Sequence, residues 1–240
     1  MPPPPSFPVR LVAARELAPA VRELSFERVE GPMTFEPGQW LQLHVPVGDR
    51  AEKRSYSIAS PPDGTANLAL AVTRVEGGPV STALHALLPG AVLTADGPTG
   101  FFTRAADAGH ASLFVGTGTG LSPLRSMLLA AVAARATEPL WVLLGVRHEE
   151  DALYVPELQA IAKLHPNVRV EVTHSQPRGD VARRGYVQAH VPELVGELRR
   201  LGHAPHVYIC GLERMVKAVR EVARKELGLD RREVHSERYD

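Results

Sequence analysis

The first half of the chain consists of short runs in which apolar and polar positions alternate, separated by turns rich in Gly, Pro and Asp. Alternation with a period of two is typical of a strand with one buried and one solvent-facing side. Such runs predict strands at residues 9–14, 21–28, 40–45, 53–59, 67–75 and 91–96. Short strands joined by tight turns favour antiparallel pairing, so we expect a six-stranded antiparallel β-barrel over residues 9–102.

One segment of this half breaks the alternation and predicts a helix. Gly77-Gly78-Pro79-Val80 leads into Ser81, after which Leu84, Leu87 and Leu88 fall on one helical face. We expect Ser81 to be the N-cap. Backbone N–H groups at such a start bind phosphate well, because the helix dipole is positive there. The alternative is a helix that only closes the mouth of the barrel.

The second half changes to alternating strand and helix patterns, which predict a Rossmann-like parallel α/β domain over residues 111–240. Strands are predicted at 111–115, 141–146, 168–173, 206–210 and 233–239, and later helices at 151–163, 192–201 and 213–227. Ser122 and Pro123 are expected to begin the first helix as its N-cap and first residue. Residues 103–110 would be a linker, and residues 1–8 a proline-rich lead-in.

Composition narrows the classes of function. The 240 residues are 44% hydrophobic, enough for a substantial core, and 27 basic residues balance 27 acidic ones. No net charge draws the chain to nucleic acid or an anionic membrane. Cys210 is the single cysteine, which excludes an internal disulfide and a cysteine-ligated iron–sulfur cluster within this chain. No run is long and apolar enough for a membrane span, and Pro2 to Pro5 do not resemble a signal peptide, so a cytoplasmic location is expected.

Two stretches carry the candidate chemistry. In Arg54-Ser55-Tyr56-Ser57, an extended backbone would place the cation and the phenol on one face, as suits a ligand with phosphates and a flat ring. An ordinary strand on a barrel surface is the alternative. Gly116-Thr117-Gly118-Thr119-Gly120-Leu121-Ser122-Pro123 joins a strand to a helix, which is a phosphate-binding arrangement. It lacks the acidic residue that follows the usual dinucleotide fingerprint.

Arg54-Ser55-Tyr56-Ser57, Gly78-Pro79-Val80-Ser81 and Gly97-Pro98-Thr99-Gly100-Phe101-Phe102 together resemble the flavin domain of the ferredoxin–NADP reductase superfamily in content, order and approximate spacing. The resemblance implies that Arg54 pairs with the flavin-nucleotide pyrophosphate. It also implies that Tyr56 lies against the isoalloxazine and that Ser57 sits near flavin N5. The remaining implied flavin-binding residues are Ser55, Val72, Arg74, Gly78, Val80 and Ser81.

The second half resembles the nucleotide domain of the same superfamily. The nucleotide-binding residues implied by its motifs are Gly116, Thr117, Gly118, Gly120, Pro123, Cys210 and Gly211. Cys210-Gly211-Leu212 is similar to the family's Cys-Gly-Pro turn, with leucine in place of proline. Arg147 is expected at the nucleotide ribose, or else in a surface ion pair. NADP-preferring relatives often have Ser-Arg where this chain has Ser175-Gln176, which favours NADH, although Arg178, Arg183 and Arg184 could instead meet a 2′-phosphate.

The C-terminal Glu237-Arg238-Tyr239 resembles the Glu-x-Tyr ending of plant-type members, whose aromatic ring stacks on the flavin; here Asp240 follows, and a frayed tail is the alternative. Ser57, Cys210, Glu237 and Tyr239 are therefore the implied catalytic residues, expected to converge at the site of hydride transfer.

The resemblance implies an FAD-dependent NAD(P)H oxidoreductase that passes electrons to a separate ferredoxin, flavodoxin or oxygenase-type acceptor. Arg50, Lys53 and Arg238 would dock an acidic partner. Reduction of free flavin, ferric complexes or quinones, a non-autonomous electron-transfer subunit, and a nucleotide-sensing module stay open as alternatives. The scattered histidines lack ligand spacing, so no metal site is expected.

Overall fold

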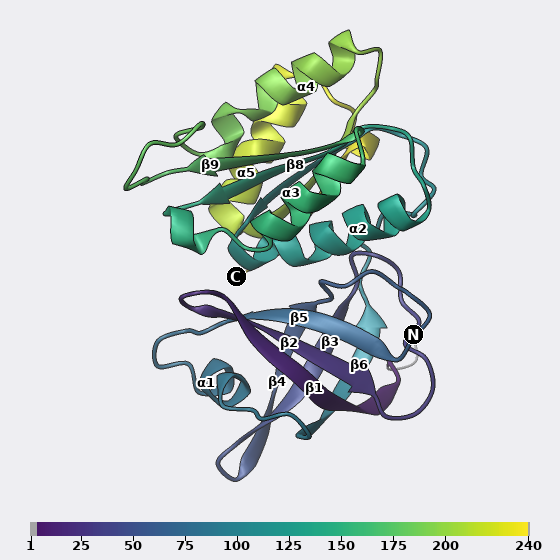
Figure 1. Ribbon diagram of the computed structural model, residues 1–240, viewed down its shortest axis with the longest axis vertical. Coiled ribbons are helices and arrows are strands. Elements are labelled where there is room, and N and C mark those ends of the chain that lie inside the picture. Colours follow the sequence, from purple (N-terminus) through teal and green to yellow (C-terminus); the bar gives the residue numbers. More distant parts are fainter. Residues whose placement is uncertain (1–3, 240) are drawn as a thin grey trace.

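The computed structural model describes residues 4–239, which form two domains that pack against each other (Figure 1). The first is an antiparallel sheet and the second is a parallel sheet covered by helices. The division agrees with the change of pattern in the sequence. Within the described residues no helix is both long and apolar enough to cross a membrane.

The strands of the first sheet, within residues 4–239, are β1 (Ser6–Ala18), β2 (Val21–Arg28), β3 (Trp40–Val47), β4 (Arg50–Ser57), β5 (Asn67–Thr73) and β6 (Val92–Thr99). Their order is β4-β3-β6-β1-β2-β5, with antiparallel pairing throughout. The sheet curls so that the chain just beyond β4 meets β5, where the Ala59 N–H donates to the Ala69 carbonyl at 2.8 Å. The expected six antiparallel strands are confirmed; they form an open strand order whose curl is consistent with the expected barrel.

Alternating side chains explain this core. In β1 Phe7, Val9 and Leu11 are buried while their neighbours are exposed, and β3 buries Leu41 and Leu43 in the same way. Because Phe7 belongs to this core, β1 begins at Ser6. The prediction that residues 1–8 are only a lead-in is therefore wrong for residues 6–8, while residues 1–3 lie outside the described part of the chain.

The short helix α1 (Pro79–His85) begins earlier than predicted. Its N-cap is Gly78, and Pro79 is its first residue, a position that proline's fixed φ suits. The prediction that Ser81 is the N-cap is wrong. The Ser81 hydroxyl instead accepts a hydrogen bond from the Val75 N–H at 3.0 Å and donates one to the Gly78 carbonyl at 3.1 Å. Ser81 thus ties the loop before α1 to the helix.

The parallel sheet, within the described residues, contains β7 (Ser112–Thr117), β8 (Leu140–Val146), β9 (Val168–His174), β10 (His206–Leu212) and β11 (Val234–Tyr239). Its order is β11-β10-β7-β8-β9. The helices are α2 (Leu121–Ala133), α3 (Val155–Leu164), α4 (Val191–Arg200) and α5 (Glu213–Glu221). Every β8 residue is buried, as expected for a strand covered on both faces.

Two hydrophobic layers hold the second domain together. Side chains of α4 and α5 pack on one face of the sheet, and those of α2 and α3 on the other. The layer containing α2 also includes Val21, Ala59, Ala71 and Phe102 from the first domain. Figure 1 accordingly shows α2 between the parallel sheet and the barrel. The core of the second domain is therefore continuous with the domain interface.

Several helix boundaries differ from their predictions. The helix α2 begins at Leu121 with Gly120 as its N-cap, so Ser122 and Pro123 lie inside its first turn. Residues 151–163 form a short turn and then α3, because Tyr154 adopts a left-handed φ of 57°. The predicted helix 213–227 continues beyond α5 as a π-helical turn over Val222–Glu226, and Gly228 follows with a φ of 64°.

Stacked rings brace the start of the parallel strands. His110 in the linker stacks on His206 with 3.7 Å between ring centroids, and Tyr208 stacks on His235 of β11 at 4.4 Å. Burial and the nearby charges of His206 and Arg104 lower the pKa of His110 to about 4. The pKa of His206 and of His235 is lowered as well, chiefly by burial.

These shifts predict acid sensitivity. As the pH falls from about 6.5 toward 4, these three histidines bind protons in the unfolded chain before they do in the folded chain, so their contribution to the free energy of unfolding decreases. We expect the urea concentration at the unfolding midpoint to fall less between pH 7.5 and pH 4.5 in a His110→Gln variant than in the wild type. An equal fall of the midpoint in the two proteins would contradict the lowered pKa of His110.

Candidate functional site

The two domains meet around two adjacent cavities that share Thr73 of β5 in their walls. The larger cavity, about 690 Å³, lies mainly at the carboxyl ends of the parallel strands. The smaller cavity, about 410 Å³, lies mainly on the barrel and is closed by residues of the second domain. In open α/β sheets this end of the strands is the usual place for a ligand.

The smaller cavity collects most of the residues expected to bind flavin. All four residues of Arg54-Ser55-Tyr56-Ser57 line it, together with the start of α1 from Gly78 to Ser81. Arg54 is exposed and donates to Glu52 Oε2 at 2.9 Å. Burial raises the pKa of Tyr56 to about 12, so its phenol stays protonated at neutral pH. The cavity therefore offers a cation, a neutral phenol and backbone N–H groups on one surface.

Ser57, at the end of β4, meets the C-terminal strand of the other domain. Its Oγ donates to Glu237 Oε1 at 3.3 Å and accepts a hydrogen bond from the Tyr239 hydroxyl at 2.7 Å. Cys210 is fully buried on the neighbouring strand, in register with Glu237. The structure thus brings together the four residues implied as catalytic. Asp240 lies outside the described residues.

Burial dominates the electrostatics of this group. It raises the pKa of Glu237 to about 7, even though the hydrogen bond from Ser57 acts in the opposite direction. The pKa of Cys210 is raised by burial and by the nearby Glu237 carboxylate, so the thiol is neutral. Burial also raises the pKa of Tyr239. Glu237 is therefore the member of this group that can gain and lose a proton near neutral pH.

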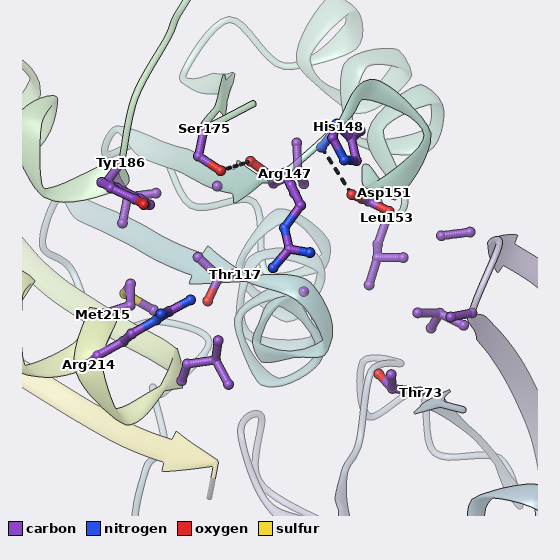
Figure 2. Close-up of a pocket in the computed structure, with 18 of the residues that line it drawn as sticks. Thr73, Thr117, Arg147, His148, Asp151, Leu153, Ser175, Tyr186, Arg214 and Met215 are labelled. Carbon is purple, nitrogen blue, oxygen red and sulfur yellow. Dashed lines mark hydrogen bonds between the residues drawn. The ribbon is translucent and has the colours of Figure 1, made fainter. Parts of the chain in front are cut away.

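The larger cavity carries positive charge. Thr117 and Gly118 of the glycine-rich turn line it, as do Arg147 after β8 and Arg214 at the start of α5. Figure 2 shows both guanidinium groups pointing into the cavity, with Thr117 beside them. Within residues 4–239 neither guanidinium has a hydrogen bond or ion pair to another side chain. An anionic ligand would provide a hydrogen-bond acceptor and a counter-charge for both guanidinium groups.

Glycines allow the turn after β7 to approach β10 closely. A Cβ on Gly120 would lie 2.3 Å from the Cys210 carbonyl oxygen, and one on Gly211 would lie 2.4 Å from Thr117 Oγ1. Gly211 also has a φ of 148°, which other residues rarely adopt. The two strand ends therefore meet only because both positions are glycine.

Two buried hydroxyl groups in the cavity walls lack hydrogen-bond partners, and this bears on which ligands the cavities suit. Thr117 is among the residues that line the larger cavity and Ser122 among those that line the smaller one, and neither side-chain hydroxyl has a partner in the described part of the chain. A buried hydroxyl without a hydrogen bond is costly. Phosphate or ribose oxygens would satisfy both hydroxyls, as the arginines would satisfy phosphate charge. The donors present therefore suit nucleotide cofactors in both cavities.

Several predicted residues lie elsewhere. Val72 is fully buried in the barrel core, and its neighbours Ala71 and Thr73 line the smaller cavity instead. Arg74 is exposed and lines neither cavity, and Pro123 is buried within α2. Alternation along β5 explains the first difference, because a one-residue offset turns a side chain from the cavity to the core.

None of the three arginines considered for a 2′-phosphate lines the larger cavity. Arg183 pairs with Glu171 and Glu193, at 2.9 and 2.6 Å. Arg178 pairs with Glu150 at 2.6 Å, and Arg184 lies 3.7 Å from Asp180. Sequence reasoning missed Arg214, although a cation in the first turn of the helix predicted at 213–227 was a usable signal.

The cations expected to dock an acceptor are also dispersed. Lys53 donates to Asp96 at 2.9 Å, and Arg238 donates to Glu213 at 2.7 Å. Arg50 is exposed at the β3–β4 hairpin. None of the three lines either cavity as described. Among residues 4–239 no group of three or more metal-ligating side chains is placed to hold a metal ion.

Comparisons with known proteins agree with this arrangement. Residues 8–103 match the family of oxidoreductase FAD-binding domains, and residues 114–221 match the family of oxidoreductase NAD-binding domains. Ferredoxin–NADP reductase B of Sorangium cellulosum is 56% identical over 98% of both chains. The toluate 1,2-dioxygenase electron transfer component of Pseudomonas putida is 28% identical over 91% of this chain, which spans 62% of that protein.

Solved structures show the same fold. The Amycolatopsis cytochrome P450 reductase GcoB superimposes with a TM-score of 0.87 at 28% identity, over 98% of this chain and 69% of that one. The Plasmodium falciparum ferredoxin–NADP⁺ reductase gives a TM-score of 0.81 at 23% identity, over 98% and 96% of the two chains. The two-domain architecture is therefore shared over 98% of this chain.

Proposed function

Because this chain belongs to the ferredoxin–NADP reductase superfamily, we propose that it takes a hydride equivalent from NADPH through bound FAD and delivers electrons to a separate carrier protein. The observation that carries the proposal is the junction of the two cavities. Ser57 from the FAD-binding domain is hydrogen-bonded to Glu237 and Tyr239 from the second domain. Ser57 and Tyr239 line the smaller cavity, whose wall shares Thr73 with the larger one.

The smaller cavity suits the flavin. When bound, FAD supplies a group that accepts a hydride equivalent and releases electrons one at a time. Arg54 is exposed at the cavity, where exchange of its Glu52 partner for pyrophosphate costs little. The N–H groups at the start of α1 and the unpartnered Ser122 hydroxyl add hydrogen-bond donors. Tyr56 offers a flat, neutral surface for the ring system.

The larger cavity suits the nicotinamide nucleotide. Thr117 and the turn that follows it provide hydrogen-bond donors for the pyrophosphate. Arg147 and Arg214 both point into the cavity without a side-chain partner within residues 4–239, and a 2′-phosphate would engage both. Ser175-Gln176 favours NADH on the sequence alone, but the second cation supports NADPH. The name of the 56% identical relative also includes NADP.

The residues at this contact between the two domains position the reactants and handle protons. Ser57 holds both the Glu237 carboxyl and the Tyr239 hydroxyl, which fixes the C-terminal strand against the barrel. Glu237, with a pKa of about 7, can hold or release a proton at Oε1. Cys210, neutral and buried, contributes shape and excludes water, with no covalent role.

The electron acceptor is proposed to be a separate ferredoxin or an oxygenase component. The single cysteine is buried beside Glu237, so this chain has no cysteine set for a cluster of its own. One relative, 31% identical over 73% of this chain, is the ferredoxin–NAD⁺ reductase component of an alkene monooxygenase system from Xanthobacter autotrophicus. Dependence on the cytoplasmic pool of NADPH favours a cytoplasmic location.

Visible spectroscopy tests the proposed function. We expect the purified protein, loaded with FAD, to show flavin absorbance that NADPH bleaches anaerobically at far lower concentration than NADH. Addition of an oxidised ferredoxin should then restore the absorbance. A protein that binds no FAD, or whose flavin neither nucleotide reduces, would show the proposal to be wrong. Bleaching by NADH alone would overturn the nucleotide assignment only.

A further inference from the structure

The helix α2 contacts both sides of the proposed reaction site, but its most buried charge serves neither cavity. At its start, Gly120 touches the Cys210 carbonyl, and Ser122 faces the smaller cavity. One turn further on, Arg125 is 8% exposed and lines neither cavity. A buried guanidinium is costly unless its donors are satisfied, so its partners indicate its purpose.

Arg125 reaches from the second domain into the first. Its Nη1 donates to the Ala59 carbonyl at 2.6 Å, and its Nη2 donates to Glu157 Oε1 of α3 at 2.5 Å. The guanidinium carbon lies 4.4 Å from the centre of the Tyr154 ring. The next residue, Ser126, donates to the Ser60 carbonyl at 2.7 Å. Ala59 and Ser60 follow directly from the strand that ends at Ser57.

The barrel contributes a second cation to the same contact. Arg15 of β1 donates to the buried Glu23 of β2 at 2.6 Å and lies 3.8 Å from Glu157. Its guanidinium carbon is 5.9 Å from the Tyr154 ring centre. Arg15, Glu23, Arg125, Tyr154 and Glu157 therefore form one interdomain clamp, with Tyr154 between the two cations.

The interdomain clamp is connected through α2 to both the flavin side and the nucleotide side of the proposed reaction site. Arg125 holds the main chain two residues after Ser57, while Gly120, the N-cap of the same helix, lies against the Cys210 carbonyl. Ser57 belongs to the flavin side and Cys210 to the nucleotide side. A helix is stiff over one or two turns, so α2 sets the spacing between these residues. A charge-assisted hydrogen bond to a backbone carbonyl is well suited to fixing such a distance.

We propose that Arg125 is a positioning residue that sets the spacing between flavin and nicotinamide by holding the Ala59 carbonyl. This inference rests on the proposed function, because it assigns Arg125 a role in hydride transfer between the two cavities. It predicts that binding of each cofactor persists without Arg125, since Arg125 lines neither cavity. The loss should appear in the rate of transfer, where a displacement of about 1 Å costs up to about 100-fold.

The test compares Arg125→Met and Arg125→Lys with Arg199→Met. The control removes an arginine-to-carbonyl hydrogen bond, from Arg199 to Leu227 at 2.9 Å, that lies away from the interface. We expect Arg125→Met to retain FAD and bind NADP⁺ within about twofold of wild type, but to be reduced by NADPH at least about tenfold more slowly. Arg125→Lys should keep part of the wild-type rate of flavin reduction. The control Arg199→Met should keep the full wild-type rate.

Amide hydrogen exchange gives a readout independent of turnover. In Arg125→Met, residues 58–61 should exchange faster, while exchange in β7 and β8 stays unchanged. If Arg125→Met does not fold, Ser126→Ala and Glu157→Gln weaken the same contact and should slow reduction in the same way. A wild-type rate of flavin reduction in Arg125→Met, or in Ser126→Ala and Glu157→Gln if Arg125→Met does not fold, would overturn the positioning role. A slow rate that is explained by lost cofactor affinity would overturn it as well.

The two proposals fail differently. A wild-type protein whose flavin neither nucleotide reduces would refute the proposed function, and the positioning role would fall with it. Normal reduction of the wild type together with equally fast reduction of Arg125→Met would refute the positioning role alone.

Discussion

A Ser57→Ala variant is expected to keep its FAD yet be reduced by NADPH about 100-fold more slowly than the wild type. Ser57 Oγ is the common partner of Glu237 and Tyr239, which come from the other domain. Without it, both half-buried groups lose a hydrogen bond, and the C-terminal strand loses its direct tie to β4. Anaerobic rapid mixing, followed by the loss of flavin absorbance, measures the rate.

The pH profile of this variant adds a sharper readout. The hydrogen bond from Ser57 lowers the pKa of Glu237, which burial has raised to about 7. Its removal should therefore move an inflection of the reduction rate to higher pH. Ser236→Ala is the matched control, because Ser236 lies on the same strand and lines neither cavity. Wild-type rate and profile in Ser57→Ala would contradict its assigned role.

A double variant, Arg147→Met with Arg214→Met, is expected to raise the dissociation constant for NADPH by at least about 100-fold. Each guanidinium points into the larger cavity and, within residues 4–239, has no side-chain partner, so a bound phosphate is its natural counter-charge. A hydrogen bond between charged groups contributes about 1.5–3 kcal/mol, so each single variant should lose about tenfold or more. Titration of the flavin difference spectrum with NADP⁺ measures the affinity.

The control removes two arginines whose ion pairs lie outside the cavity. Arg178→Met with Arg184→Met should leave the affinity for NADP⁺ unchanged, since their partners are Glu150 and Asp180. NADH should bind the Arg147 and Arg214 double variant nearly as well as the wild type. An equal loss for NADH would place the two cations at the shared pyrophosphate, and unchanged NADPH binding would refute the assignment.

Periodicity was sufficient for the architecture because each domain buries its side chains by a simple rule. Alternation located the barrel strands, and β2 was predicted with its exact ends, Val21–Arg28. The predicted helix starts were wrong where a serine was taken as the N-cap although an earlier residue began the helix. Pro79 set the start of α1 ahead of Ser81, and Leu121 began α2 ahead of Ser122. In both cases a serine that resembles a cap lies inside the helix.

Motifs located the two cofactor-binding regions but did not determine which side chains enter the cavities. Val72 lies one position from the cavity wall, and that single step along β5 places it in the barrel core. Arg183 was an available cation by sequence, yet Glu171 and Glu193 neutralise it. Arg214 carried no motif, although it projects into the larger cavity. Side-chain direction and pairing are set by packing.

Local patterns in the chain are enough to predict an antiparallel domain followed by a parallel α/β domain, because period and loop chemistry are local properties. The resemblance of its motifs to one family adds the flavin and the nicotinamide nucleotide as the ligands. The hydrogen bonds of Ser57 with Glu237 and Tyr239, and of Arg125 with the Ala59 carbonyl, are seen only in the folded chain. These contacts join residues far apart along the chain. They depend on how two hydrophobic faces dock, and no local pattern records that orientation.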